Sequence, residues 1–451
     1  MKHSLFITGA SGFIAGHLLR GINPEEYENI YCLSRKESKL MTSLSKQEGF
    51  KFIKGSIYDA DLYAPYLAAS DIVVHFAAIT GKARPDEYFK VNSEGTEFLI
   101  KQCEKAGVRN FLYLSSIAVK FPDISSYYYA QSKKQGEDAL RSSTLNYTIV
   151  RPAIVIGQGS PILESLSKLA RAPVIPIFGD GTTKIQPIYV NDLADCLLHI
   201  LKGNIFQNET FDLGGPEVIT IEDFIKKIHQ GYSKERPRTI HIPLGLLIPL
   251  LSHLEKYFYS FLPFTIGQLS SFRYDGTIGE NRLYLKLLPG MQGVDKMLEL
   301  SIGSVHNLEH ECEVFGSYLI NQKPNEYVLE KYQEGHQKGE MSKVPATGSF
   351  DRLLLTIAGI NPFFTKLTDL YSRLFFKGSI LRKKLVLLLA ILECSTPAHH
   401  YFLPEKKANK GMFYIKTFQV GFFSLFTLIL FSAIVMPFHL ILTKASRSPG
   451  Q

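Results

Sequence analysis

Short apolar runs alternate with amphipathic stretches through the first 150 residues of the chain. The runs are rich in β-branched and aromatic residues and most end at charges or turn residues, which predicts strands. The periodic apolar positions between them predict helices, for example over residues 12–20 and 86–106. This alternation predicts a parallel sheet covered by helices on both faces. The predicted strands are residues 4–8, 30–34, 51–55, 71–76, 110–116 and 146–152.

The pattern becomes less regular after residue 152. Glycine-rich stretches at residues 156–161 and 178–184 predict loops. A helix is predicted over residues 189–201, with Asn191 or Asp192 as its N-cap. The apolar stretch at residues 240–265 is interrupted by prolines and charges. It therefore predicts amphipathic helices that pack on the fold or touch a membrane surface.

The end of the chain is strongly apolar. Residues 417–443 contain no Asp, Glu, Lys or Arg and exceed the ~20 residues that a helix needs to cross a bilayer. This length predicts a transmembrane helix rather than a buried core helix. Four lysines shortly precede the segment, whereas only Lys444 and Arg447 follow it. The positive-inside rule then predicts a single-pass membrane protein whose large N-terminal part faces the cytoplasm.

Composition excludes some classes of function. The 451 residues carry a formal net charge of +8, a modest excess that lies largely near the C-terminus, so nucleic-acid binding is not expected. The five cysteines show no C-x-x-C spacing and are interpreted as reduced thiols. The sequence shows no Cys/His cluster with metal-ligand spacing, so no metal site is predicted.

A glycine-rich turn joins the first predicted strand to the first predicted helix. In "FITGASGFIAGHL", Gly9 allows a tight turn, and Gly12 lets the backbone approach a pyrophosphate. Ala15 and Gly16 keep the helix close to the sheet. The free N–H groups at the helix N-terminus favour an anion. The turn therefore predicts dinucleotide binding.

The residues after the second predicted strand bear on the choice of nucleotide. A carboxylate at this position holds the ribose hydroxyls of NAD. Ser34, Arg35 and Lys36 instead supply a hydroxyl and two cations, which suit a 2′-phosphate and favour NADP over NAD. The alternative is an ordinary solvated basic turn.

These features resemble the extended short-chain dehydrogenase/reductase family, which contains NAD-dependent epimerases, dehydratases and reductases. The resemblance covers roughly residues 1–275 and implies a Rossmann-type, doubly wound parallel sheet. The matching motifs stand in order at residues 8–16, 54–59, 73–78, 91–96, 114–119, 129–133, 151–159 and 189–194.

The family's catalytic pair is Y-x-x-x-K. Of the three consecutive tyrosines at residues 127–129, only Tyr129 has a lysine four residues later, Lys133. Residues at this spacing share one helix face, and a nearby ammonium is expected to lower the pKa of a phenol. By resemblance, Lys133 also binds the nicotinamide ribose, Ser116 holds the substrate oxygen, and Asn92 supports the site.

The resemblance also implies a set of cofactor contacts. They are expected at Thr8, Gly9, Ser11, Gly12, Phe13, Ile14, Ser34, Arg35, Lys36, Ser56, Ile57, Phe76, Ala77, Ala78, Tyr129, Lys133 and Pro152.

The sequence departs from the nucleotide-sugar members of the family. Ser56 replaces the usual adenine-contacting aspartate, and Ile154 replaces an asparagine. Ile185 and Gln186 stand where those members carry Arg and Asp, and isoleucine cannot clamp a pyrophosphate. Lys184 is a partial substitute. These departures disfavour a nucleotide sugar, and the apolar stretches favour a lipid-like substrate.

The sequence thus predicts a membrane-anchored NAD(P)-dependent oxidoreductase that transfers hydride to or from a carbonyl or secondary alcohol. An NDP-sugar epimerase or dehydratase and a non-catalytic NADP(H)-binding membrane subunit or assembly factor are the alternatives. Whether the protein forms a homodimer is left open by the sequence. The expected organisation is a catalytic domain at residues 1–278, with the cofactor core mainly at 1–155 and the substrate portion at 155–278. A helical extension at 279–400 and the helix at 417–443 follow.

Overall fold

The computed structural model divides into two compact units, Met1–Gly303 and Ser304–Gln451. The first unit contains the fold and the candidate site. The structure describes residues 2–302 except 38, 173, 233–235, 246, 250, 252–254 and 256–264, and in the second unit residue 354 and the helical residues 368–372.

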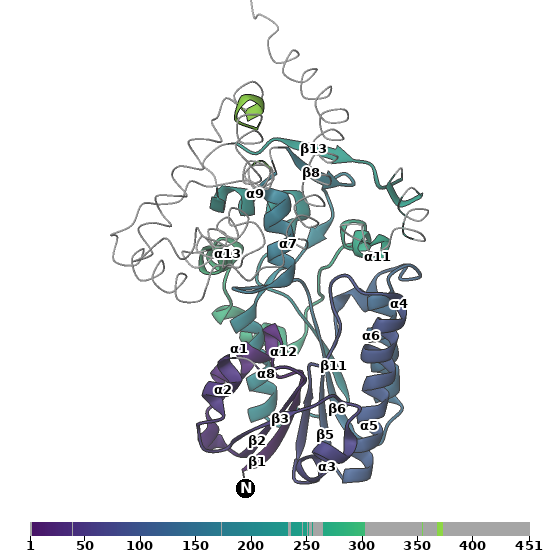
Figure 1. Cartoon of the computed structure of the whole chain (residues 1–451), viewed down its shortest axis with the longest axis vertical. Coiled ribbons are helices and arrows are strands. Elements are labelled where there is room, and N and C mark those ends of the chain that lie inside the picture. Colours follow the sequence, from purple (N-terminus) through teal and green to yellow (C-terminus); the bar gives the residue numbers. More distant parts are fainter. Residues whose placement is uncertain are drawn as a thin grey trace, which may run out of the picture. The chain divides into compact units, whose positions relative to one another are not determined.

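A seven-stranded parallel sheet with the order β11-β6-β5-β4-β1-β2-β3 organises the first unit (Figure 1). All four residues of β4 are buried, and its first three, Ile72–Val74, form a continuous apolar run rather than an alternating pattern. The predicted α/β class and the first six strands are confirmed. The strands are β1 (His3–Thr8), β2 (Tyr27–Ser34), β3 (Phe50–Lys54), β4 (Ile72–His75), β5 (Asn110–Leu114), β6 (Asn146–Pro152) and β11 (Glu209–Leu213).

Helices cover both faces of the sheet, as Figure 1 shows. On one face Leu18 and Leu197 join the core, and on the other Leu67 and Leu99 do. The first face carries α1 (Phe13–Gly21), α2 (Lys39–Leu44), α8 (Val190–Lys202) and α12 (Arg282–Leu287), and the second carries α3 (Ala60–Ala68), α5 (Gly95–Ala106) and α6 (Tyr128–Arg141).

The helix predicted over residues 86–106 is not regular. It consists of α4 (Pro85–Tyr88), a π-helical turn η2 (Phe89–Glu94) and α5. The wider turn holds Asn92 fully buried. Such π-turns are often found at functional sites, and the apolar periodicity of the sequence gives no sign of this one.

The predicted cap of the helix near residue 190 is wrong. α8 has Tyr189 as its N-cap, without a side-chain cap hydrogen bond. The side chains of the two predicted caps instead form hydrogen bonds with residues distant in sequence. Asn191 Oδ1 lies 2.7 Å from His17 Nδ1, and Asp192 Oδ2 accepts from the Gln292 N–H at 2.7 Å.

A smaller portion of the first unit has its own core, formed by α7 (Pro161–Ala170), α9 (Ile221–Tyr232) and α13 (Val294–Ile302). The glycine loops around residues 159 and 180 are confirmed by positive φ angles. The helices predicted from residue 240 begin instead with a strand, since residues 239–242 pair with β8. The short strand pairs are β7 (Val155–Ile156) with β10 (Ile188–Tyr189), β9 (Lys184–Ile185) with β12 (Ile219–Thr220), and β8 (Ile175–Phe178) with β13 (Thr239–Ile242). The remaining short elements are η1 (Pro24–Glu26), η3 (Ile117–Lys120), α11 (Ile266–Leu269), η4 (Ser270–Phe272) and η5 (Leu288–Gly290).

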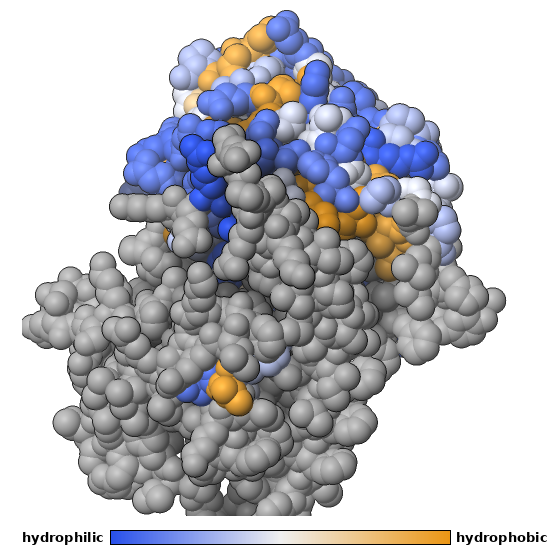
Figure 2. Space-filling model, turned by 90° about the horizontal axis from the view of Figure 1, so that it is seen from above, coloured by the Kyte–Doolittle hydropathy of each residue, from blue (hydrophilic) through white to orange (hydrophobic). Residues whose placement is uncertain are grey.

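The predicted membrane localisation is corrected. No helix within the described residues is long and apolar enough to cross a bilayer. α6 and α8, for example, have 14 and 13 residues, against the ~20 that a span requires. The segment behind the prediction, residues 417–443, lies outside the described residues. The described surface in Figure 2 is mostly hydrophilic, with smaller hydrophobic groups between. The predicted domain bounds and the homodimer stay predictions.

Candidate active site

The predicted site residues gather at the carboxyl edge of the sheet. β1 ends at Thr8, β4 at His75 and β5 at Leu114, and the strands run parallel. In open α/β sheets this edge is where ligands bind. The glycine turn, the loop after β4, and Ser116 therefore converge, although about 100 residues separate the first from the last.

The glycine turn is packed against the loop after β4. Gly9 has φ +66°, and a Cβ built on it would lie 2.6 Å from the Ala77 backbone nitrogen. Gly12 donates its N–H to the Gly9 carbonyl at 2.9 Å and begins α1 without any side-chain cap. The first N–H groups of α1 are therefore not capped by a side chain. This arrangement fits the phosphates of a dinucleotide.

A buried chain of hydrogen bonds runs from Thr8 to Asn92. Thr96 donates its hydroxyl proton to the Asn92 carbonyl at 2.8 Å, so His75 Nε2, 3.0 Å from Thr96 Oγ1, must be the donor of that pair. His75 Nδ1 then accepts from the Thr8 hydroxyl at 2.6 Å. Burial lowers the pKa of His75 to about 3, with the Lys133 charge adding, so the imidazole is neutral.

Ser11, from the glycine turn, and Ser34, at the end of β2, are in contact. Their hydroxyl oxygens are 2.6 Å apart, and Ser34 Oγ also donates to the Lys36 carbonyl at 3.0 Å. Ser34 is buried, whereas Arg35 and Lys36 are exposed. The two cations are thus available to a ligand, and the serines stabilise the turn that presents them.

The other predicted cofactor contacts lie along the same edge. Ser56 and Ile57 follow β3, and Ile57 lies close to Gly95, at 2.5 Å from a Cβ built there. The Ser56 hydroxyl accepts from the Tyr58 N–H at 3.3 Å. Phe13 and Ile14 begin α1, residues 76–78 follow β4, and Pro152 ends β6.

Tyr129 and Ser116 are brought together from α6 and the end of β5. The Ser116 hydroxyl accepts from the Ala118 N–H at 3.2 Å and is hydrogen-bonded to Tyr129. Burial raises the pKa of Tyr129 well above its ordinary value, Tyr127 adds to this, and the hydrogen bond with Ser116 opposes it. The phenol is therefore protonated at neutral pH.

Lys133 is almost completely buried, with 2% of its surface exposed. Its ammonium lies 4.1 Å from the centroid of the Tyr113 ring. Burial lowers the pKa of Lys133 to about 7, and the charge of Glu137 opposes that shift. The expectation that Lys133 lowers the pKa of Tyr129 stays a prediction, because burial is the largest influence on that pKa here.

Asn92 acts through the backbone around the site. Its Oδ1 accepts from the Ile79 N–H at 2.7 Å, and its Nδ2 donates to the Ile79 carbonyl at 3.0 Å and to Ser132 Oγ at 3.1 Å. Ser132 in turn donates to the Tyr129 carbonyl at 2.8 Å. Asn92 thereby ties the loop after β4 to the first turn of α6.

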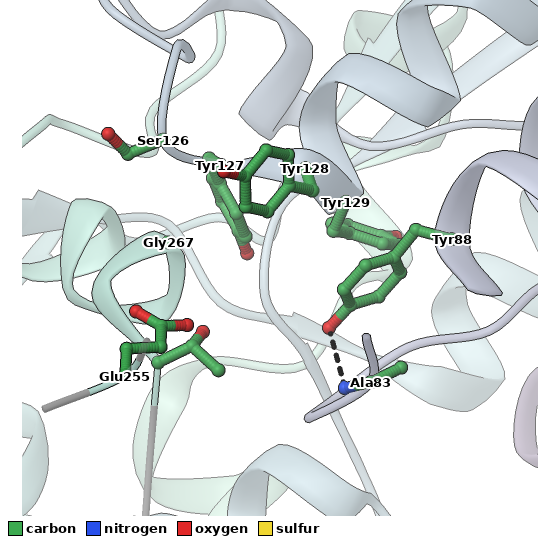
Figure 3. A pocket seen from close by; sticks show the side chains of 9 residues that line it. Ala83, Tyr88, Ser126, Tyr127, Tyr128, Tyr129, Glu255 and Gly267 are labelled. Carbon is green, nitrogen blue, oxygen red and sulfur yellow. Dashed lines mark hydrogen bonds between the residues drawn. The ribbon is translucent and has the colours of Figure 1, made fainter. Parts of the chain in front are cut away.

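A pocket opens beside Tyr129 (Figure 3). The Tyr127 and Tyr88 rings lie 5.8 and 6.1 Å from the Tyr129 ring, between centroids, and the Tyr88 hydroxyl accepts from the Ala83 N–H at 3.2 Å. None of the described residues that line it is Lys, Arg or His. They are Ala83, Tyr88, Ser126, Tyr127, Tyr128, Tyr129, Glu255, Thr265 and Gly267.

Ile185 and Gln186, which stand where nucleotide-sugar members carry Arg and Asp, make their contacts inside the protein. Ile185 is buried, and Gln186 donates to the Gly215 carbonyl at 2.8 Å and accepts from the Ile278 N–H at 3.0 Å. Lys184 is exposed. Neither Ile185 nor Gln186 can therefore contact a pyrophosphate unless these buried contacts are broken.

Two buried residues at the site escaped the sequence analysis. Glu137 follows Lys133 at helical spacing, so its place on the same face could have been read from the sequence. His75 ends a strand and carries no comparable signal, because its partners Thr8 and Thr96 are brought to it only by the fold.

Comparison with known proteins gives a family match for the part of the chain that contains this site. Residues 5–214 match the model of the NAD dependent epimerase/dehydratase family. The chain is 30% identical over 195 residues to a ceramide reductase of Caulobacter vibrioides, covering 42% of this chain and 57% of that protein. It is 26% identical over 248 residues to the mitochondrial NADH dehydrogenase [ubiquinone] 1 alpha subcomplex subunit 9 of Arabidopsis thaliana, covering 53% and 60%. The match thus spans less than two thirds of either relative.

The fold is shared with solved structures. One is UDP-glucuronic acid 4-epimerase from Bacillus cereus in complex with UDP-glucuronic acid and NAD. The two chains are 19% identical, with a TM-score of 0.52, over 66% of this chain and 98% of the epimerase.

Proposed function

From the match of residues 5–214 to the NAD dependent epimerase/dehydratase family, we propose that this chain is an NAD(P)-dependent carbonyl reductase of that family. The observation that carries the proposal is the placement of Ser116, shortly after β5, and of Tyr129 and the buried Lys133, both on α6, at one edge of the sheet. These three groups lie at the sheet edge where the uncapped α1 turn fits a dinucleotide.

Each side chain has a defined role in this proposal. When bound, the nicotinamide cofactor supplies the hydride. The Tyr129 phenol donates its proton to the substrate oxygen as the carbonyl is reduced, and the Ser116 hydroxyl hydrogen-bonds the same oxygen. A phenol whose pKa is raised by burial holds its proton at neutral pH, which favours the direction that consumes a proton. The reverse oxidation uses the same groups.

A lipid-like carbonyl compound is the substrate class that the surroundings favour. Four of the nine described residues that line the pocket beside Tyr129 are tyrosines, and none of the nine is a cation. Because the Gln186 side chain is hydrogen-bonded inside the protein, it cannot bind a diphosphate at that position. The name of the Caulobacter relative also indicates a reductase with a lipid substrate.

The cofactor proposed is NADP(H). Arg35 and Lys36 stand exposed directly after β2, where they can meet a 2′-phosphate. NADPH is therefore expected to bind more tightly than NADH, and the Arg35→Asp variant should reverse or abolish that preference.

The test uses the full chain. NADPH and NADH are titrated separately by nicotinamide fluorescence, and turnover is then measured with long-chain ketones and with UDP-sugars. Tyr129→Phe should lower ketone reduction by about 10²–10⁴-fold but retain NADPH binding, whereas Tyr66→Phe, on α3 and outside the pocket lining, should leave both intact.

Two outcomes favour the alternatives. Turnover of UDP-sugars without net cofactor consumption indicates an epimerase. NADPH binding without any turnover, and unaffected by Tyr129→Phe, indicates a non-catalytic subunit. If neither nucleotide binds, the proposal is refuted.

A further inference from the structure

A fully buried carboxylate lies one helical turn beyond Lys133. Glu137 has no exposed surface and accepts hydrogen bonds from three side chains. Arg151 Nε and Nη2 donate to it at 2.8 and 2.5 Å, Arg141 Nη2 at 2.9 Å, and the Ser115 hydroxyl at 2.5 Å. A buried charge with this many donors is held in one position.

These bonds link the two elements that carry the active-site side chains. Ser115 directly precedes Ser116, and its N–H also donates to the Val150 carbonyl at 2.7 Å. Glu137 belongs to α6, the same helix as Tyr129 and Lys133. The Ser115–Glu137 bond therefore ties the end of β5 to α6 and limits how far Ser116 can move from Tyr129.

The same carboxylate is the only anionic side chain among the described groups that act on Lys133. Glu137 lies at i+4 from Lys133, so the two share a face of α6. The other groups around Lys133 are the Tyr113 ring from β5 and the neutral His75 from β4. Arg151 and Arg141 are paired with Glu137 and partly offset its charge.

We propose that Glu137 is a positioning residue of the active site, which holds Ser116 against Tyr129 and keeps Lys133 cationic. This inference rests on the proposed function, because it assigns Lys133 to the cofactor site. Burial lowers the pKa of Lys133 to about 7, and the negative charge of Glu137 keeps it from falling further. Removal of that negative charge should therefore leave Lys133 neutral at physiological pH.

The test is the pH dependence of NADPH binding by the full chain, measured by nicotinamide fluorescence from pH 5.5 to 9. Wild-type affinity should fall as Lys133 loses its proton. In Glu137→Gln the midpoint of that fall should move to lower pH, by on the order of one unit. In Lys133→Arg the fall should disappear, since guanidinium stays charged.

Arg141→Gln is the matched control. It also removes a hydrogen bond to Glu137, but it takes away a positive charge, so the midpoint should not move to lower pH. If the midpoint of Glu137→Gln equals that of wild type, Glu137 is merely structural and the inference is overturned. If wild type binds no NADPH, the proposed function fails instead.

Ser115→Ala tests the positioning role without unpairing a buried charge. On a ketone that wild type reduces, kcat should fall at least tenfold while the NADPH-binding midpoint stays in place. An unchanged kcat contradicts the positioning of Ser116. This variant also serves if Glu137→Gln does not fold.

Discussion

Replacing Gly9 by alanine should destabilise the first unit and weaken dinucleotide binding. The new Cβ would lie 2.6 Å from the Ala77 nitrogen, 2.7 Å from its Cα and 2.8 Å from the Phe76 carbonyl carbon, all of them backbone atoms. The left-handed φ of +66° adds strain of about 1–2 kcal/mol. The steric conflict adds about 1–3 kcal/mol, because backbone cannot yield as a flexible side chain can.

Gly107→Ala separates the two contributions. Gly107 ends α5 at φ +74°, and a Cβ there meets nothing within 4 Å, so only the backbone strain applies. In urea unfolding followed by far-UV circular dichroism, Gly107→Ala should lose about 1–2 kcal/mol, and Gly9→Ala about 1–3 kcal/mol more.

Nucleotide binding provides a second readout of the same pair of variants. Gly9→Ala should weaken NADPH binding at least tenfold, because the loop after β4 must move. Gly107→Ala lies at the far end of α5 and should leave binding unchanged. Equal unfolding free energies for the two variants would refute the close approach of Gly9 to the loop after β4.

Three further outcomes are expected. Asn92→Ala should cost about 1–3 kcal/mol of unfolding free energy, since it leaves the Ile79 N–H and carbonyl without their side-chain partner; an unchanged urea midpoint contradicts this. Tyr129→Phe should lower ketone reduction by about 10²–10⁴-fold at unchanged NADPH affinity, and a loss of binding instead would contradict its role as proton donor. His75 has a folded pKa of about 3, below its ordinary value of 6.5, so the stability that it contributes is present above pH 6.5 and is lost as the pH falls. Unfolding free energy measured from pH 7 to 4 should fall less steeply in His75→Gln, by up to about 1.4 kcal/mol per pH unit, and equal slopes would show that His75 does not titrate in this way.

The sequence alone determined the class of fold and the place of the site. Apolar runs separated by helical periodicity specify a parallel sheet because each element carries its own period. The glycine turn before α1 and the spacing of Tyr129 and Lys133 are likewise local, so they could be recognised from neighbours within a few residues.

The tertiary structure decided the electrostatics and the departures from regularity. The high pKa of Tyr129 and the low pKa of Lys133 arise from burial by residues distant in sequence. The π-turn that holds Asn92 and the strand at residues 239–242 likewise depend on partners that the fold supplies. Desolvation and non-local hydrogen bonds depend on what surrounds a side chain, and no local pattern encodes those surroundings.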